Sequence, residues 1–187
     1  AEKNTILVDK SAFASSDTVA YTFAVKEIPA DRPDITFDNN TYNVTVNVKK
    51  TETLNAITLS ASVDKTTVPT IINQKLGKAI LYKVVKDIDG TGFKPDVDFK
   101  FSLKVDGKVV KDDIIINVSK DETSRFVTGY YPVDTVLTFE ETDAKGFECT
   151  EPVKTVTIID ETGEIPSAEV EFVNQRPQPG QTSITLS

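Results

Sequence analysis

The sequence predicts an all-β protein built from two tandem β-sandwich units, and three observations carry this prediction. Apolar residues recur at every second position in many short runs, which is the period of a half-buried strand. Turn residues such as Asp106-Gly107 separate these runs at short intervals. A pattern also occurs twice: a strand that ends in Glu, several further strands, and a strand that ends in Asn-Gln.

The first predicted unit covers residues 1–75 and contains two clear amphipathic runs. Apolar and polar residues alternate over residues 21–27 and again over residues 42–48, so each run predicts a strand with one buried face. Glu27 falls on the face that two aromatic residues and a valine mark as core. Asn73 ends the last predicted strand of this unit.

The second predicted unit covers residues 76–187, and Gly77 is predicted to supply a short linker ahead of it. Its many short strands favour a sandwich over an α/β fold. Residues 121–125 could hold one helical turn, and the tail is either an exit linker or ends in one more strand at 183–186. The other strands are predicted at 80–85, 99–105, 109–110, 114–118, 136–140, 153–159 and 168–173.

Three polar residues of the second unit fall on strand faces that their neighbours mark as core. They are Lys83 in residues 80–85, Glu140 in residues 136–140 and Asn174 in residues 170–174. Burying an amine, a carboxyl and a carboxamide separately costs several kcal/mol each, because an uncompensated buried charge is strongly disfavoured. We therefore expect the three side chains to lie together.

Such a cluster can react. Burial lowers the pKa of an amine and raises that of a carboxyl group, so the pair can exist as a neutral amine beside a protonated acid. A neutral Lys83 can attack the side-chain carbonyl carbon of Asn174 while Glu140 polarises that carbonyl and shuttles protons. Ammonia then leaves, and the product is an intramolecular isopeptide bond.

The order of these residues resembles a known family. Leu-Tyr-Lys83-Val, Leu-Thr-Phe-Glu140-Glu and Glu-Phe-Val-Asn174-Gln are similar to the contexts found in isopeptide-forming domains of Gram-positive pilins and surface adhesins. The resemblance is strongest to major pilins of the streptococcal T-antigen type, which stack Ig-like domains of the collagen-adhesin B type. It implies that the bond forms autocatalytically and that the domain has a mechanical role.

The first unit departs from this family in one respect. No strand ahead of Glu27 carries a lysine far enough upstream, since Lys3 and Lys10 lie in the segment that corresponds to the strand beside Glu27. We expect the first unit to lack its opening strand, with that strand removed, disordered or supplied by another chain. Glu27 and Asn73 would then be a catalyst and an electrophile without a resident lysine.

Composition excludes several function classes. The net charge is -8 without a basic stripe, so nucleic acid and anionic membranes are poor partners. The chain has no histidine, which removes the usual general base and the commonest metal ligand, and it has no phosphate-binding glycine loop. We expect no cofactor and no enzymatic activity. A single cysteine, Cys149, allows no internal disulfide, so an isopeptide bond is the expected covalent staple.

Other motifs have weaker interpretations. Asp87, Asp89, Thr91, Gly92 and Asp98 match the oxygen spacing of a calcium loop, but strands rather than helices flank them, which favours an ordinary inter-strand loop. Cys149 could form an internal thioester, although its sequence context favours a partly buried structural thiol. The triplets that begin at Asn39, Asn43 and Asn117 have the glycosylation pattern, to which a bacterial origin gives no role.

The sequence therefore predicts a structural protein of the Gram-positive cell wall, either a pilus subunit or the stalk of a sortase-anchored adhesin. Its expected partners are other pilin subunits joined by sortase, and host surface proteins if the alternative function, a ligand-binding adhesin domain, applies. An accessory carbohydrate-binding module is disfavoured, since five tyrosines and no tryptophan offer little aromatic platform. Neither a sortase sorting signal nor a pilin-type Tyr-Pro-Lys motif is present, because Val133 follows Tyr131-Pro132.

Overall fold

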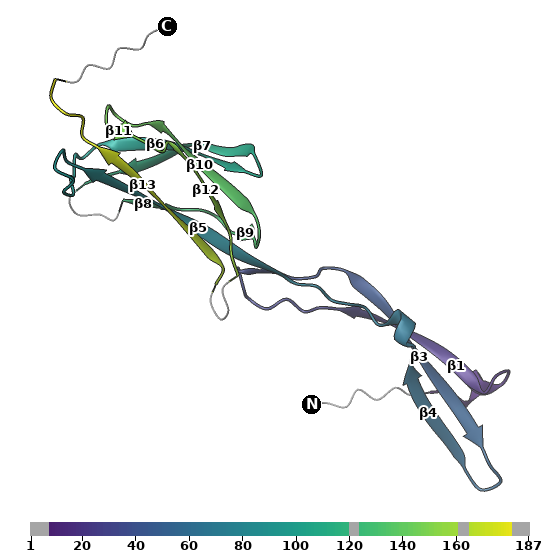
Figure 1. The fold of residues 1–187 in the computed structure, drawn as a ribbon. Coiled ribbons are helices and arrows are strands. Elements are labelled where there is room, and N and C mark those ends of the chain that lie inside the picture. Colours follow the sequence, from purple (N-terminus) through teal and green to yellow (C-terminus); the bar gives the residue numbers. More distant parts are fainter. Residues whose placement is uncertain (1–7, 120–123, 161–164, 181–187) are drawn as a thin grey trace. The chain divides into compact units, whose positions relative to one another are not determined.

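A computed structural model describes residues 8–119, 124–160 and 165–180, and it divides the chain into two compact units (Figure 1). The first unit comprises Ala1–Asp31 and Phe37–Asn73, and the second comprises Arg32–Thr36 and Gln74–Ser187. The division falls between Asn73 and Gln74, and the short segment Arg32–Thr36 belongs to the second unit.

The first unit contains one antiparallel sheet in the order β1-β3-β4, formed by Thr18–Lys26, Thr41–Glu52 and Ile57–Val63. The 3-10 turns η1 (Lys10–Phe13) and η2 (Lys65–Thr67) accompany it. The register aligns alternating apolar residues of β1 and β3 on one face, and Val63 of β4 continues this face opposite Val46. Leu59 and Ile57 of β4 instead lie opposite Lys50 and Glu52. The predicted amphipathic strands are therefore present.

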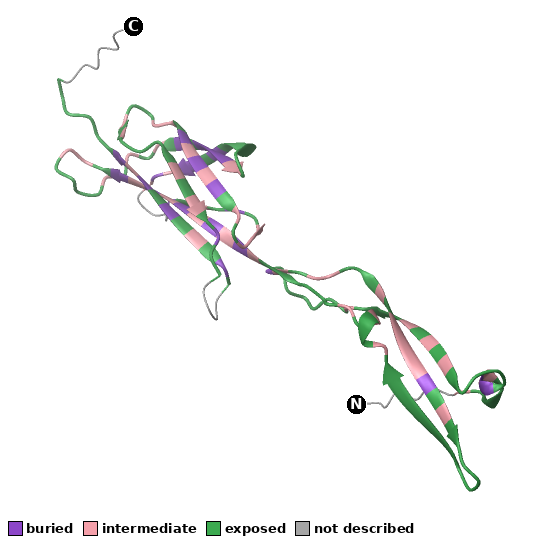
Figure 2. Cartoon of the chain, turned by 45° about the vertical axis from the view of Figure 1, so that its right-hand side comes forward, coloured by how far each residue is buried: buried purple, intermediate pink, exposed green. Residues whose placement is uncertain are grey.

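A second layer over this apolar face is not among the described residues of the first unit. Of the apolar side chains that the structure describes there, only Phe13 and Val48 are buried. Figure 2 shows the strands of this unit mainly in the colours of intermediate and exposed residues. The second unit is thus a sandwich, whereas the described residues of the first form a single sheet.

The second unit has two sheets. One is antiparallel, in the order β12-β10-β6-β7, and the other has the order β11-β13-β5-β2. Two short strands, β8 and β9, also pair with β5. The bounds of all these strands are β2 Ile35–Thr36, β5 Gln74–Lys86, β6 Asp98–Val105, β7 Lys108–Asn117, β8 Arg125–Val127, β9 Tyr131–Pro132, β10 Val136–Asp143, β11 Glu148–Cys149, β12 Val153–Thr157 and β13 Ser167–Gln175.

Side chains from both sheets form one hydrophobic core, which confirms the all-β sandwich. Phe101 of β6 meets Phe172 of β13 edge to face, with 5.2 Å between ring centroids. The predicted turn at Asp106-Gly107 joins β6 to β7, with positive φ at both residues, as a tight hairpin requires. The largest fully buried side chains are Phe99, Phe101, Phe139, Phe172, Leu81, Leu103, Ile114, Leu137, Ile158, Val85 and Val118, together with Asn174.

The longest strand, β5, runs parallel to β13, so two segments that are almost 90 residues apart lie side by side (Figure 1). Gly77, predicted to lie in a linker, is instead a buried residue of β5. A Cβ atom at this position would lie 2.2 Å from the carbonyl oxygen of Pro166, so glycine is needed for the close approach of two backbones.

Several predictions differ in detail or lie outside the described residues. The two strands predicted at 109–110 and 114–118 form one strand, β7. The helical turn predicted at 121–125 and the strand predicted at 183–186 fall wholly or mainly outside the described residues. No helix in the described ranges is long and apolar enough to cross a membrane.

Candidate isopeptide site

Lys83 lies in the interior of the second unit. On β5 it alternates with Leu81 and Val85 toward the core, and its side chain is completely buried. Its Nζ lies 4.6 Å from the centroid of the Phe99 ring, so an aromatic face covers the amine. The structure thus places Lys83 on the face that the alternation predicted.

Asn174 lies on the neighbouring strand β13, with its side chain pointing into the same core. Phe172 pairs with Lys83 and Asn174 pairs with Val85, so Asn174 is displaced from Lys83 by one pleat repeat along the strands. Asn174 is fully buried. The first and last long strands of the unit therefore bring an amine and a carboxamide to one region of the core.

The carboxyl group at this site comes from the facing sheet. Glu141 of β10 places its Oε1 2.8 Å from Lys83 Nζ. The same oxygen accepts a hydrogen bond of 2.9 Å from Asn174 Nδ2. The Glu141 side chain is 1% exposed, and one buried carboxylate oxygen therefore touches both prospective partners of an amide bond.

The prediction that Glu140 fills this position is wrong. Glu140 Oε2 accepts a hydrogen bond of 2.8 Å from Lys104 Nζ, and its side chain is 38% exposed. Leu137, Phe139 and Glu141 form the inward face of β10, and a shift of one residue exchanges the two faces of a strand. The sequence could have shown this, because the large apolar residues Leu137 and Phe139, rather than Val136 and Thr138, mark the core face of the strand.

The electrostatic environment suits a reactive amine. Burial lowers the pKa of Lys83, and the contacts with Glu141 oppose this shift. Within the described residues, Asn174 Oδ1 and Glu141 Oε2 are buried without a hydrogen-bond partner. Buried polar atoms are rarely left unpaired, and each costs about 1–3 kcal/mol, so these two oxygen atoms are open to accept a proton or a hydrogen bond within the cluster.

Cys149 borders the same cluster, a position that the sequence analysis did not foresee. It lies on β11 directly opposite Asn174 of β13. Burial and a hydrogen bond with Glu141 raise the pKa of its thiol to about 11. At neutral pH the side chain is a protonated thiol, which disfavours the nucleophilic role that a thioester would need.

The first unit contains a related pair. Asn73 Nδ2 donates a hydrogen bond of 2.8 Å to Glu27 Oε1, although the two residues lie 46 positions apart. Asn73 Oδ1 accepts a hydrogen bond of 3.0 Å from the backbone N–H of Asp38. Across residues 8–119, 124–160 and 165–180, no lysine forms an ion pair with Glu27. Lys3 lies outside those residues.

The loop that resembles a calcium site uses its oxygen atoms locally. Asp89 Oδ1 accepts hydrogen bonds from the backbone N–H and the hydroxyl of Thr91, and Asp98 Oδ1 accepts one from Asn117. The described part of the chain contains no group of three or more carboxylate, cysteine or histidine side chains placed to hold a metal ion. These contacts are those of an inter-strand loop.

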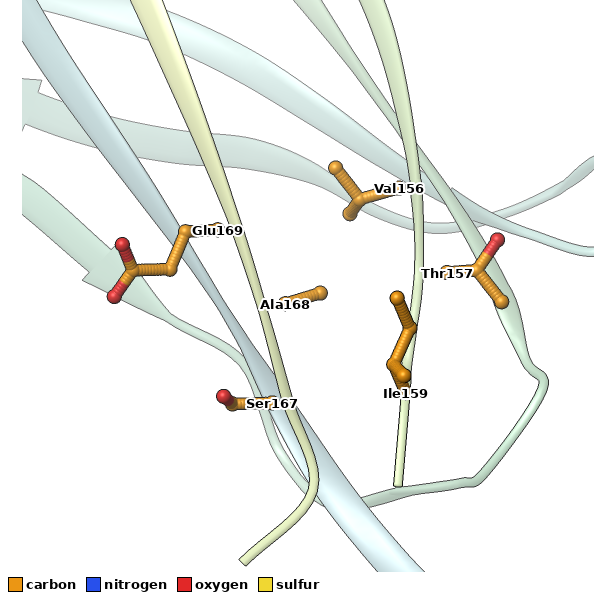
Figure 3. A pocket seen from close by; sticks show the side chains of 6 residues that line it. All are labelled: Val156, Thr157, Ile159, Ser167, Ala168 and Glu169. Atoms are coloured by element: carbon orange, nitrogen blue, oxygen red, sulfur yellow. The ribbon is translucent and has the colours of Figure 1, made fainter. Parts of the chain in front are cut away.

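A surface pocket between β12 and β13 carries no comparable chemistry. Its lining includes Val156, Ile159 and Ala168, and Figure 3 shows the Glu169 carboxylate directed away from Val156. The lining has no aromatic side chain and no pair of titratable groups. It therefore offers neither a catalytic site nor the aromatic groove that a host-ligand site would favour.

A comparison with protein families gives a match in the first unit. Residues 4–74 match the family model described as FctA, a Spy0128-like isopeptide containing domain. No curated protein matches the chain. The family match confirms, for the first unit, the resemblance to isopeptide-forming pilin domains that the sequence indicated.

Similar solved structures are streptococcal pilins. The major pilin T3.2 of Streptococcus pyogenes is 17% identical, with 84% of this chain and 68% of that one covered and a TM-score of 0.35. The minor pilin GBS52 of Streptococcus agalactiae is 17% identical, with 82% and 66% covered and a TM-score of 0.40. Since both TM-scores lie below 0.5, these similarities add no argument about function.

Proposed function

We propose that this chain is a structural subunit of a Gram-positive cell-surface pilus or adhesin stalk, and that an amide bond between Lys83 and Asn174 cross-links its second unit. The observation that carries the proposal is the contact of one buried Glu141 oxygen with both Lys83 Nζ and Asn174 Nδ2. The isopeptide-domain match over residues 4–74 supports it. The role that the sequence alone assigned to Glu140 passes to Glu141.

The reaction can be written with every atom accounted for. Lys83 gives up a proton to Glu141 and becomes a neutral amine, which burial favours. The amine attacks Cγ of Asn174, and the protonated Glu141 stabilises the developing negative charge on the carbonyl oxygen once the carboxamide turns that oxygen toward it. Glu141 then carries a proton from the lysine nitrogen to the leaving nitrogen. Ammonia departs, and the carboxyl group is regenerated.

The buried position of the three groups favours this chemistry in two ways. Lys83 and Asn174 are held together by the β5–β13 pairing, so the reaction is effectively intramolecular. The surrounding core, including Phe99, excludes water that would solvate the amine. The step consumes Asn174, so the chain modifies itself once and does not turn over as an enzyme.

The bond suits a load-bearing protein. It joins β5 and β13, the first and last long strands of the second unit, so force applied along the chain would load a covalent link instead of separating two strands. In the chain-entropy model used for disulfides, closing a loop of this length stabilises the fold by ~4.6 kcal/mol. We further propose an extracellular location in a pilus, with sortase-made links to other pilin subunits.

Intact-mass measurement of the purified chain tests the proposal. We expect the wild-type mass to be one ammonia below the value calculated from the sequence, and tandem mass spectra to join the Lys83 and Asn174 peptides. Asn174→Ala should restore the full calculated mass. Glu140→Ala, a matched control on the opposite face of β10, should keep the ammonia loss. A folded wild-type chain with its full mass would overturn the cross-link.

A further inference from the structure

The geometry points to a positioning role for Gln175, the residue that follows Asn174: its side-chain amide, bound to the loop at residues 87–92, fixes the end of β13 and so presents Asn174 to Lys83. The inference rests on the proposed cross-link and adds to it a residue that sets the rate of the reaction without touching the reacting atoms. It gives a role to two sequence features that the cross-link leaves unused, the Asn-Gln doublet and the loop whose spacing resembles a calcium site.

Asn174 is the last inward-facing residue of β13, because the strand ends at Gln175. The ends of elements open more readily than their centres, since fewer contacts hold them. Asn174 is nevertheless fully buried. Attack by an amine needs the reacting atoms about 3–3.5 Å apart in a fixed orientation, and a misplacement of about 1 Å can slow a reaction about 100-fold. The rate of the cross-link therefore depends on how firmly this strand end is held.

Gln175 holds the strand end from its outward face. Its Nε2 donates to the carbonyl oxygens of Asp87 and Ile88, at 3.4 and 3.2 Å. These oxygens belong to the loop that follows β5, so the two bonds tie the end of the strand that carries Asn174 to the end of the strand that carries Lys83. Because successive side chains of a strand point to opposite faces, a Gln175 fixed outside keeps Asn174 directed into the core.

The loop has internal hydrogen bonds that make it a firm anchor. The backbone N–H of Asp87 donates to the carbonyl oxygen of Thr91 at 2.8 Å, and that of Gly90 donates to the carbonyl oxygen of Asp87 at 2.9 Å. Asp89 Oδ1 accepts hydrogen bonds from the backbone N–H and the hydroxyl of Thr91. The oxygen atoms that resemble calcium ligands thus hold the shape of the loop, and with it the carbonyl groups that Gln175 contacts.

The next residue, Arg176, adds a weaker contact to the same loop. Its backbone N–H donates to the carbonyl oxygen of Lys86 at 2.9 Å. Its guanidinium lies 3.7 Å from Asp87 Oδ1 and 5.3 Å from the centroid of the Phe93 ring. The Arg176 side chain is 52% exposed, where ion pairs contribute little. Gln175 is adjacent to Asn174 and bonds two carbonyl groups, so we expect its loss to have the larger effect.

The time course of ammonia loss measures this role. The full chain is made by cell-free translation, a translation inhibitor stops synthesis, and samples are quenched at intervals for intact mass. Gln175→Met keeps the length of the side chain and removes the donor. We expect it to lengthen the half-time of ammonia loss about 10–100-fold, while the final mass still lacks one ammonia. Resistance to thermolysin, followed in the same samples, should appear at the wild-type rate.

Two further variants identify the group responsible. Gln175→Arg restores N–H donors at this position and should bring the half-time back toward that of the wild-type chain. Glu171→Met is the matched control, since Glu171 is exposed on the same outward face of β13 but lies four residues before Gln175. It should keep the wild-type half-time. Arg176→Met should slow the reaction less than Gln175→Met does.

The pH dependence separates positioning from a general opening of the core. Lys83 has its pKa lowered by burial, and loss of the Gln175 contacts leaves it buried. The rate for Gln175→Met should therefore fall by the same factor at every pH. If the substitution instead let water reach Lys83, the pKa of the amine would rise and the profile of rate against pH would move to higher pH.

Several results would overturn this role. They are an unchanged half-time for Gln175→Met, a profile displaced to higher pH, a slowing that Gln175→Arg does not relieve, or thermolysin resistance that appears as slowly as the ammonia is lost. Each of these leaves the proposed cross-link standing, because the wild-type chain still loses ammonia. A folded wild-type chain that never loses ammonia would instead overturn the proposed function, and the role of Gln175 with it.

Discussion

The two units hold the same pair of functional groups, a glutamate hydrogen-bonded to an asparagine amide, in different surroundings. In the second unit, Glu141 and Asn174 lie in a closed core and contact Lys83. In the first unit, Glu27 is partly buried, Asn73 is exposed, and the apolar face beside them is open among the described residues. The comparison separates the glutamate–asparagine pair from the second layer of side chains that buries an amine beside it.

This difference has a physical meaning. A lysine becomes a good nucleophile when burial lowers its pKa, as the core does for Lys83. An open sheet cannot lower the pKa of an amine in this way until a second layer covers it. Among the described residues, the first unit thus has the glutamate and the amide without a buried amine beside them.

Of the substitutions that test this difference, Glu141→Ala should have the largest effect on the stability of the second unit. It removes the proton carrier, so the cross-link and its ~4.6 kcal/mol of loop-closure stabilisation are lost, and it leaves Lys83 buried without its partner. We expect the free energy of unfolding of the second unit to fall by at least about 4 kcal/mol, measured by denaturant titration alongside intact mass.

Glu140→Ala provides the matched control for that experiment. Glu140 pairs with Lys104 at the surface, where an ion pair contributes about 0–1 kcal/mol. The mass should differ from that of the wild-type chain only by the substitution, and stability should change by less than about 1 kcal/mol. If Glu140→Ala rather than Glu141→Ala abolished the ammonia loss, the assignment made from the structure would be wrong.

Gly77→Ala should have the next largest effect on stability. It tests the close packing of the sandwich separately from the cross-link. The new methyl group would lie 2.2 Å from Pro166 O and 2.6 Å from Ile158 Cγ2, and the backbone oxygen cannot move aside easily. We expect a loss of about 2–3 kcal/mol in the second unit, with the ammonia loss retained.

Gly92→Ala is the control for this substitution, because nothing lies within 4 Å of the position that its Cβ would occupy. Its stability should change by less than about 0.5 kcal/mol. Equal effects of the two substitutions on the unfolding midpoint would contradict the close backbone approach at Gly77.

The reactivity of Cys149 measures how well solvent is excluded from the cluster of Lys83, Glu141 and Asn174. Because burial and Glu141 raise the pKa of the thiol to about 11, the thiolate should appear only as the pH approaches that value. Alkylation by iodoacetamide at about pH 8 should be about 100-fold slower in the folded chain than in denaturant, and it should accelerate as the pH rises. Equal rates in both states would show that the thiol lies in solvent.

How far the sequence predicted this site depends on how strongly each strand marks its core face. Lys83 and Asn174 are flanked by large apolar residues at every second position, and the structure places both in the core. In β10, apolar residues and threonines alternate less clearly, and the sequence assignment chose the wrong one of two adjacent glutamates. A single-residue error in strand register changes which glutamate faces Lys83 and Asn174.

Features that depend on three-dimensional contacts could not be predicted from the sequence. The proximity of Cys149 to Glu141 arises from pairing between β11 and β13, and the burial of Gly77 arises from its contact with Pro166. The described residues of the first unit form a single sheet where a sandwich was expected, because alternation shows that a strand has an apolar face but not which element covers it.

Glu27→Ala should have the smallest effect on stability, and it tests whether the first unit differs from the second. The substitution removes the acceptor of one hydrogen bond from an exposed amide, but it also removes a buried oxygen that has no partner among the described residues. These two contributions oppose each other, so the free energy of unfolding of the first unit, measured by proteolysis with thermolysin, should change by no more than about 1 kcal/mol. The mass should differ from that of the wild-type chain only by the substitution. Gain of one ammonia together with a loss of several kcal/mol would instead reveal a cross-link already present in the first unit, and the difference drawn between the units would disappear.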